Sequence, residues 1–207
     1  MSWPRWLPSS AAVITHLAYL HGFRSSPRSF KAQRMQAVVD QLNAGGARLT
    51  YWCPQLPPSP RAAIELVERE LRTWPAESRA VIGSSLGGFY ATVMAERLDC
   101  PAIVINPVVE PARDLARYIG EQTSYHDPDD RFFFRPEFVD ELKALEVHPT
   151  RPERYFALIA TGDEVLDWRE MQARYAACPT QVVQGSDHSL HDFETYLPEV
   201  LRRLGWG

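Results

Sequence analysis

The most informative stretch of this chain is Val81-Ile82-Gly83-Ser84-Ser85-Leu86-Gly87-Gly88-Phe89-Tyr90. An apolar run leads into Gly-x-Ser-x-Gly, and a segment of small residues with helical character follows. This order predicts a strand, a sharp turn and a helix, which is the pattern of a nucleophile elbow. Such a turn lifts the hydroxyl of Ser85 above the edge of a sheet, where a substrate carbonyl can reach it. The alternative is a Gly/Ser-rich turn that binds phosphate or merely reverses the chain.

Apolar runs alternate with amphipathic segments along the rest of the chain. Strands are expected at residues 13–20, 49–53, 79–83, 102–106, 155–160 and 180–184. Helices are expected at residues 28–42, 60–74, 86–98 and 168–177, with a last helix that opens at Pro198. This alternation predicts an α/β fold with about six mostly parallel strands flanked by helices, and ligands that bind at the carboxyl ends of the strands.

The alternation pauses between residues 107 and 150. We expect a cap-like insertion there, with two helices that pack over the sheet edge, inside one domain that spans 13–207 after an N-terminal extension at 1–12. The aromatic run Phe132-Phe133-Phe134 could line an acyl pocket, or it could anchor the insertion to the core. If the run lines a pocket, trimming Phe133 should change the chain-length preference of the enzyme.

Composition narrows the class of protein. The chain has 207 residues and a net charge of −4, so it indicates no broad nucleic-acid or membrane-surface role. Its three cysteines are scattered singly, which favours a reducing, cytoplasmic location over a disulfide framework. No apolar run is long enough to span a membrane, and the start lacks the features of a signal peptide. No metal-ligand spacing is present, and we expect neither a metal nor another cofactor.

Two further residues complete a candidate catalytic triad. A serine hydroxyl needs a base that takes its proton, and the base needs a partner that fixes its tautomer. His188 follows the strand expected at 180–184, and Asp163 follows the strand expected at 155–160. The chain order Ser85, Asp163, His188 is that of α/β-hydrolases.

Nearby residues compete for both supporting roles. His191 lies three residues after His188, but we expect it at the surface or behind the site. The acid could also be Glu164 or Asp167. We favour Asp163 because it comes first after the strand, whereas Asp167 is better placed as the N-cap of the next helix.

The oxyanion of a tetrahedral intermediate needs N–H donors. In this fold one donor is the backbone N–H of the residue after the nucleophile, here Leu86, and the other comes from a loop after an early strand. His21-Gly22-Phe23 ends the first expected strand, so we assign the second donor to the N–H of Phe23. Gly22 permits the close approach. His21 itself lies in the wrong place for the base, and an ordinary turn is the alternative for this segment.

The chain resembles the YqiA-type esterases, which are small bacterial α/β-hydrolases. The resemblance covers nearly everything from Leu17 to Leu204 and rests on residues 19–23 with 25–29, 54–58, 83–92, 106–107, 161–167 and His188. Residues 1–12, Arg24 and residues 184–187 depart from the pattern. The resemblance implies a cytosolic hydrolase of carboxylic esters, or alternatively of acyl-CoA thioesters, with Ser85, Asp163 and His188 as the triad.

Together these features predict a serine esterase that works through an acyl-enzyme intermediate on a small-molecule ester or thioester. The rival hypotheses are an acyl-CoA thioesterase and a catalytically silent α/β-hydrolase that serves as a binding module. The presence of all three triad residue types favours an enzyme, because a binding module has no need of them.

Overall fold

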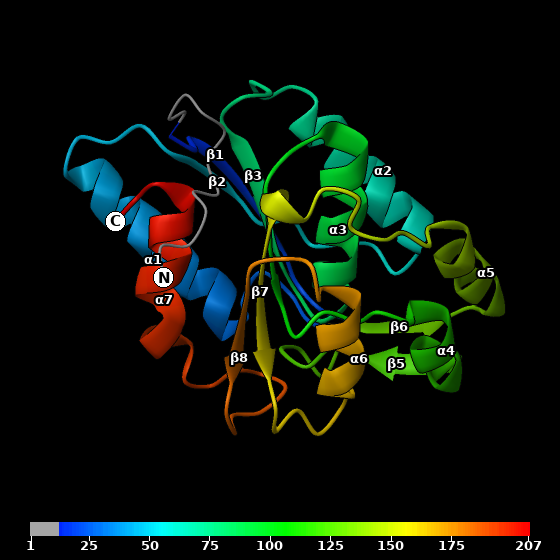
Figure 1. The fold of residues 1–207 in the computed structure, drawn as a ribbon. Coiled ribbons are helices and arrows are strands. Elements are labelled where there is room, and N and C mark those ends of the chain that lie inside the picture. Colours follow the sequence, from blue (N-terminus) through cyan, green and yellow to red (C-terminus); the bar gives the residue numbers. More distant parts are fainter. Residues whose placement is uncertain (1–12) are drawn as a thin grey trace.

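A computed structural model describes residues 13–207, so the extension expected at 1–12 lies outside the described residues. Six strands form a parallel sheet in the order β2-β1-β3-β4-β7-β8 (Figure 1). The strands of this sheet are β1 (His16–Leu20), β2 (Thr50–Trp52), β3 (Arg79–Ser84), β4 (Ala102–Ile105), β7 (Tyr155–Ala160) and β8 (Thr180–Val183). The expected parallel α/β architecture is confirmed.

Helices cover both faces of the sheet (Figure 1). On one face lie α1 (Phe30–Ala44) and α7 (Phe193–Leu204). On the other face lie α2 (Pro60–Leu71), α3 (Leu86–Leu98) and α6 (Trp168–Arg174). A short 3-10 helix, η2 (Pro152–Arg154), precedes β7. None of the helices within residues 13–207 has the length and apolar character that crossing a membrane requires.

The apolar runs form this sheet because it is buried from both sides. Every residue of β3, β4 and β7 is buried, as is usual for parallel strands covered by helices. Side chains alternate between the faces. In β1, Leu17 and Tyr19 therefore join the core beneath α1 and α7, whereas Ala18 and Leu20 join the core beneath α2 and α3.

The last helix begins earlier than the sequence indicated. It starts at Phe193 and contains Pro198, where we expected its first turn. Proline lacks the N–H that would bond to the preceding turn. The helix nevertheless extends through this position because Phe193 and Leu197 are buried against the sheet, and this packing outweighs the lost hydrogen bond.

The insertion contains the expected helical segments and a hairpin that we did not predict. The helical segments are α4 (Pro111–Leu115), the 3-10 helix η1 (Ala116–Tyr118) and α5 (Pro136–Ala144). Between them, β5 (Gly120–Thr123) and β6 (Arg131–Phe134) pair as an antiparallel hairpin beside α4 and α5 (Figure 1). The hairpin forms because alternate aromatic residues of β6 bury one of its faces.

Candidate active site

Ser85 lies in a strained turn between β3 and α3. Its backbone has φ 57° and ψ −122°, a conformation that residues other than glycine rarely adopt. Glycine is needed on both sides of it. A Cβ atom at Gly83 would stand 1.9 Å from the carbonyl oxygen of Gly87, and one at Gly87 would stand 1.9 Å from that of Leu20. The predicted strand–turn–helix is therefore present, with no room for side chains at the two flanking glycines.

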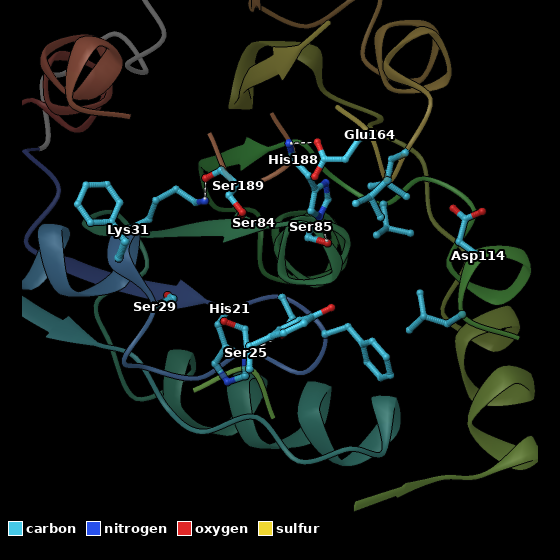
Figure 2. Close-up of a pocket in the computed structure, with 18 of the residues that line it drawn as sticks. His21, Ser25, Ser29, Lys31, Ser84, Ser85, Asp114, Glu164, His188 and Ser189 are labelled. Carbon is cyan, nitrogen blue, oxygen red and sulfur yellow. Dashed lines mark hydrogen bonds between the residues drawn. The ribbon is translucent and has the colours of Figure 1, made fainter. Parts of the chain in front are cut away.

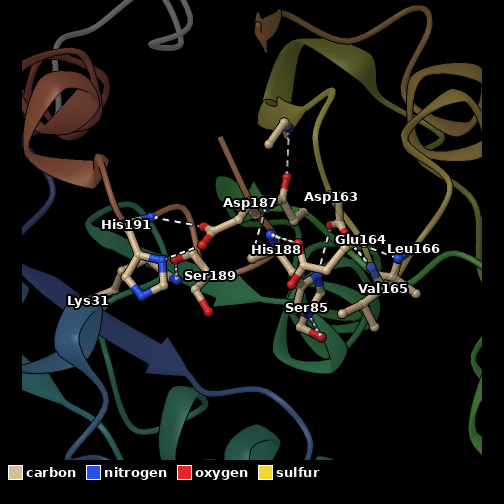
Figure 3. A network of polar contacts seen from close by, with 12 residues as sticks. Lys31, Ser85, Asp163, Glu164, Val165, Leu166, Asp187, His188, Ser189 and His191 are labelled. Atoms are coloured by element: carbon tan, nitrogen blue, oxygen red, sulfur yellow. Dashed lines mark hydrogen bonds and ion pairs between the residues drawn. The ribbon is translucent and has the colours of Figure 1, made fainter. Parts of the chain in front are cut away.

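A hydrogen-bonded chain links the three residues proposed as a triad. His188 Nε2 lies 3.0 Å from Ser85 Oγ, and His188 Nδ1 lies 2.7 Å from Asp163 Oδ2 (Figure 3). A carboxylate only accepts hydrogen bonds, so Nδ1 carries the proton and Nε2 is free to accept one from the serine. The Asp163 side chain is completely buried, whereas the His188 side chain is 18% exposed. The buried carboxylate of Asp163 thus fixes the imidazole through Nδ1, while part of the ring stays accessible to solvent.

The three candidate acids have three different positions. Asp163 Oδ1 accepts hydrogen bonds of 2.8 Å from the N–H groups of Val165 and Leu166, which orients its other oxygen toward His188. Glu164 Oε2 accepts the backbone N–H of His188 at 3.0 Å, whereas the hydrogen bonds of the imidazole go to Asp163 and Ser85. Asp167 caps α6, as expected, by accepting a hydrogen bond from the N–H of residue 169. Only Asp163 is placed to orient the imidazole.

The two other histidines considered for the base have separate partners. His191 is 78% exposed and pairs with Asp187. His21 is buried, with Nδ1 2.9 Å from the carbonyl oxygen of Gly22 and Nε2 accepting the N–H of Leu56 at 3.0 Å. Burial lowers the pKa of His21 to about 4, so its ring is neutral near pH 7. Among residues 13–207, neither histidine forms a hydrogen bond with Ser85.

Asn106 is a structural residue of this site for which the sequence analysis assigned no role. It is fully buried directly after β4. Its Nδ2 donates to the carbonyl oxygens of Asp187 and His188 at 3.1 and 3.0 Å, and its Oδ1 accepts the N–H of Ala160 at 2.8 Å. One side chain therefore joins the end of β7 to the loop that carries His188. An amide residue directly after a buried strand was the available signal.

Both residues expected to supply oxyanion donors, Leu86 and Phe23, lie near Ser85. Leu86 follows Ser85 directly. A methyl group added to Gly22 would stand 3.1 Å from Ser85 Cβ, so the loop that carries Phe23 lies against the nucleophile. In the part of the chain that the structure describes, neither the Phe23 nor the Leu86 N–H donates a hydrogen bond. Both groups are thus available to a ligand, and their role as an oxyanion hole stays a prediction.

A cavity of about 490 Å³ opens onto Ser85 and His188 (Figure 2). This size suits a small-molecule ligand. Its wall includes Leu115 and Tyr118 from the insertion and Lys31 from the first turn of α1. No cluster of three or more potential metal-ligating side chains is found within residues 13–207.

The aromatic run mainly anchors the insertion. Phe132 and Phe134 pack edge-on against Phe23, with ring centroids 5.9 and 5.2 Å away. Tyr118 contacts the same ring at 5.3 Å. Phe133 is 54% exposed and does not line the cavity that opens onto the nucleophile. The insertion is thus fixed to the loop that supplies a predicted oxyanion donor, and Phe133 is the wrong residue to test for substrate size.

Similar solved structures share this fold. A putative hydrolase from Agrobacterium vitis S4 has a TM-score of 0.71 at 15% identity, over 96% of this chain and 90% of that chain. A structure from a study of the metagenome-derived lipolytic enzymes LipS and LipT has a TM-score of 0.65 at 15% identity, over all of both chains. The esterase domain of a Rhodothermus marinus protein has a TM-score of 0.62 at 20% identity, over 94% of this chain and 88% of that chain.

At such identities the structural likeness establishes the α/β-hydrolase fold alone. A family model gives a closer assignment, because the model of an uncharacterised protein family, UPF0227, matches residues 16–204. The chain therefore belongs to the uncharacterised protein family UPF0227, which is the family of the YqiA-type proteins that its motifs resemble.

Proposed function

We propose that this protein is a serine hydrolase that cleaves carboxylic esters through an acyl-enzyme intermediate. One observation carries the proposal: the hydrogen-bonded chain from Ser85 through His188 to Asp163 faces a cavity of small-molecule size. The lipolytic and esterase proteins among the structural neighbours support the same reaction class. The three cysteines are free thiols, which favours a reducing location such as the cytoplasm.

In the proposed mechanism, each step of acyl transfer is assigned to a group of the site. Ser85 Oγ attacks the carbonyl carbon while His188 Nε2 takes the hydroxyl proton, and Asp163 stabilises the imidazolium that forms. The N–H groups of Phe23 and Leu86 hold the oxyanion, and each such donor contributes roughly 3 kcal/mol of transition-state stabilisation. His188 then protonates the leaving alcohol. In the second half of the reaction it activates a water, which releases the acid and restores the serine.

The decisive experiment compares the wild type with Ser85→Ala on p-nitrophenyl acetate, butyrate and octanoate. We expect a burst of p-nitrophenol in the wild type, because the acyl-enzyme accumulates when its hydrolysis is slower than its formation. In Ser85→Ala we expect kcat to fall by roughly 10³-fold or more. Ser78→Ala is the matched control, since Ser78 directly precedes β3, at the opposite end of the strand from the nucleophile. A folded wild type without turnover would favour a binding module instead, and an equally active Ser85→Ala would rule out Ser85 as the nucleophile.

A further inference from the structure

Unpartnered polar atoms are concentrated around one cavity. Within residues 13–207, four buried side-chain polar atoms make no hydrogen bond of normal geometry: Tyr19 Oη, Ser29 Oγ, Arg79 Nε and His126 Nδ1. Three of these residues line the cavity that opens onto Ser85, and only Arg79 lies elsewhere. Buried polar groups are almost always satisfied. Their concentration around one cavity therefore indicates that a polar ligand group completes their bonding.

Two of these atoms belong to a region that we name the α1 lobe, formed by Tyr19, Ser29, Lys31 and Ser84. All four residues line the cavity. Tyr19 lies in β1 and pairs in register with Ile82 of β3, and both belong to the core beneath α1. Ser84 comes two residues after Ile82, so it projects on the same face of the sheet. Ser29 and Lys31 reach this face from the start of α1.

Lys31 gives the lobe a positive charge, and no acid within residues 13–207 forms an ion pair with it. Its side chain extends toward Ser189, whose carbonyl oxygen accepts one hydrogen bond from Nζ (Figure 2). An ammonium has three N–H donors, so two remain for a ligand. The acid that acts on Lys31 electrostatically is Asp187, which is already bound to the ring and the backbone N–H of His191. Burial lowers the pKa of Lys31 to about 8, so most of it is protonated at neutral pH.

The start of α1 adds a second source of positive potential. Its first turn contains no acidic residue, and Ser29 stands at the N-cap without forming a side-chain capping bond. The exposed N–H groups of a helix start favour a negative group. Tyr19 contributes a hydroxyl that is fully buried and directed at the same space.

We propose that the α1 lobe binds a carboxylate carried by the substrate, so that the preferred substrates are esters with a negatively charged group distant from the scissile carbonyl. Lys31 supplies the charge, and the hydroxyls of Tyr19 and Ser29 donate hydrogen bonds. The single ammonium matches a single negative charge. This inference rests on the proposed function, because it names the class of ester that the same cavity accepts.

The test compares each charged ester with its methyl-capped neutral counterpart, in the wild type and in the variants. In the first arm, 4-nitrophenyl hydrogen adipate is compared with its methyl-capped counterpart, which places the charge on the acyl side. In the second arm, 4-carboxyphenyl butyrate is compared with its methyl ester, which places the charge on the alcohol side. The measured quantity is the ratio of kcat/KM for the charged ester to kcat/KM for the neutral one. A ratio cancels any general loss of activity from a disturbed Ser189 contact.

In one of the two arms, Lys31→Met should lower this ratio about tenfold or more, the scale of a hydrogen bond to a charged group. Tyr19→Phe should lower it about threefold or more, and this variant keeps the test possible if Lys31→Met does not fold, since it removes only an unpartnered hydroxyl. Lys143→Met is the matched control. Lys143 is the other lysine of the chain, is 64% exposed on α5 and does not line the cavity, so its loss should leave the ratio unchanged.

The outcomes separate the two proposals. If Lys31→Met and Tyr19→Phe keep the wild-type ratio in both arms while neutral esters still require Ser85, the anion site is wrong and the esterase proposal stands. If the wild type hydrolyses no ester, the esterase proposal fails. The lobe is then tested by adipate binding to Ser85→Ala, measured as a rise in Tm. Adipate should raise the Tm of Ser85→Ala more than that of the Lys31→Met,Ser85→Ala double variant. Equal shifts in the two proteins would overturn the anion site.

Discussion

Asp163 Oδ2 lies 2.7 Å from His188 Nδ1, and the carboxylate that makes this contact is completely buried behind the imidazole. Its other oxygen is held by two backbone N–H groups of the following turn. The orientation of His188 therefore depends on a carboxylate that cannot rotate without losing those bonds.

Asp163→Asn should lower kcat by roughly 10³- to 10⁴-fold, because an amide NH₂ facing Nδ1 would impose the wrong tautomer on His188. The variant should keep its far-UV circular dichroism spectrum. Glu164→Gln is the control, since Glu164 binds only the backbone N–H of His188 and an amide oxygen can accept the same bond. Its kcat should stay within about tenfold of the wild type. An equal loss in both variants would contradict the assignment of Asp163.

Asn106→Asp should reduce both stability and turnover. The new carboxylate still accepts the N–H of Ala160, but it meets two carbonyl oxygens that formerly received hydrogen bonds. We expect a loss of roughly 2–4 kcal/mol in the free energy of unfolding, together with a fall in kcat because the His188 loop shifts. Chemical denaturation and ester hydrolysis measure the two effects.

Asn43→Asp separates stability from positioning in that experiment. Asn43 also binds backbone, with Nδ2 2.9 Å from the carbonyl oxygen of Leu49 and Oδ1 accepting its N–H at 2.8 Å. It lies in α1, at the end opposite to the cavity. This variant should lose stability and keep kcat. If Asn106→Asp behaves in the same way, Asn106 holds the fold and does not position His188.

Stability should fall in acid because His21 must stay neutral in the folded protein. Its pKa is lowered from 6.5 to about 4 by burial, so between these values the unfolded chain binds a proton that the folded chain does not. The stability that the neutral His21 side chain gives to the folded protein is fully present above pH 6.5, and it is lost as the pH falls toward 4. Between pH 7 and about pH 5 the wild type should lose roughly 2 kcal/mol more unfolding free energy than His21→Gln. Urea titrations at the two pH values measure these free energies. An equal loss in the wild type and in His21→Gln would contradict the prediction.

Substrate size should depend on Tyr118 and not on Phe133. Tyr118 lines the cavity, and its removal enlarges the space beside Phe23. Tyr118→Ala should therefore raise kcat/KM for octanoate relative to acetate, by about threefold or more if roughly one extra CH₂ is buried. Phe133→Ala, which removes an exposed ring of the same insertion, should keep the wild-type profile across the p-nitrophenyl ester series.

The sequence was sufficient to select three residues that the structure brings together, because their positions follow local rules. Ser85 is found because the elbow needs glycines at fixed positions. Asp163 and His188 are found because each follows an apolar strand, and parallel strands bring their carboxyl ends to one edge. The α/β architecture follows from the same alternation, which is a local property of the chain.

The remaining features depend on contacts between distant segments. Lys31 and Ser189 are 158 residues apart, and a lysine in an amphipathic helix is usually exposed. Asn106 acquires its role only when β7 and the His188 loop stand on either side of it. The β5–β6 hairpin was missed because β5 reads Gly-Glu-Gln-Thr, which has no apolar alternation, and because β6 packs against Phe23, which is distant in the sequence.

The position of β8 at the edge of the sheet has a consequence for protein synthesis. The strand that leads to Ser85 lies in the interior of the sheet, but His188 follows β8, which comes after the other strands of this sheet in the chain. A chain still emerging from the ribosome therefore holds Ser85 before the proposed base, His188, has been placed beside it. Under the proposed mechanism hydrolysis requires β8 to have joined the sheet, so the appearance of activity during translation in vitro would report the docking of this strand.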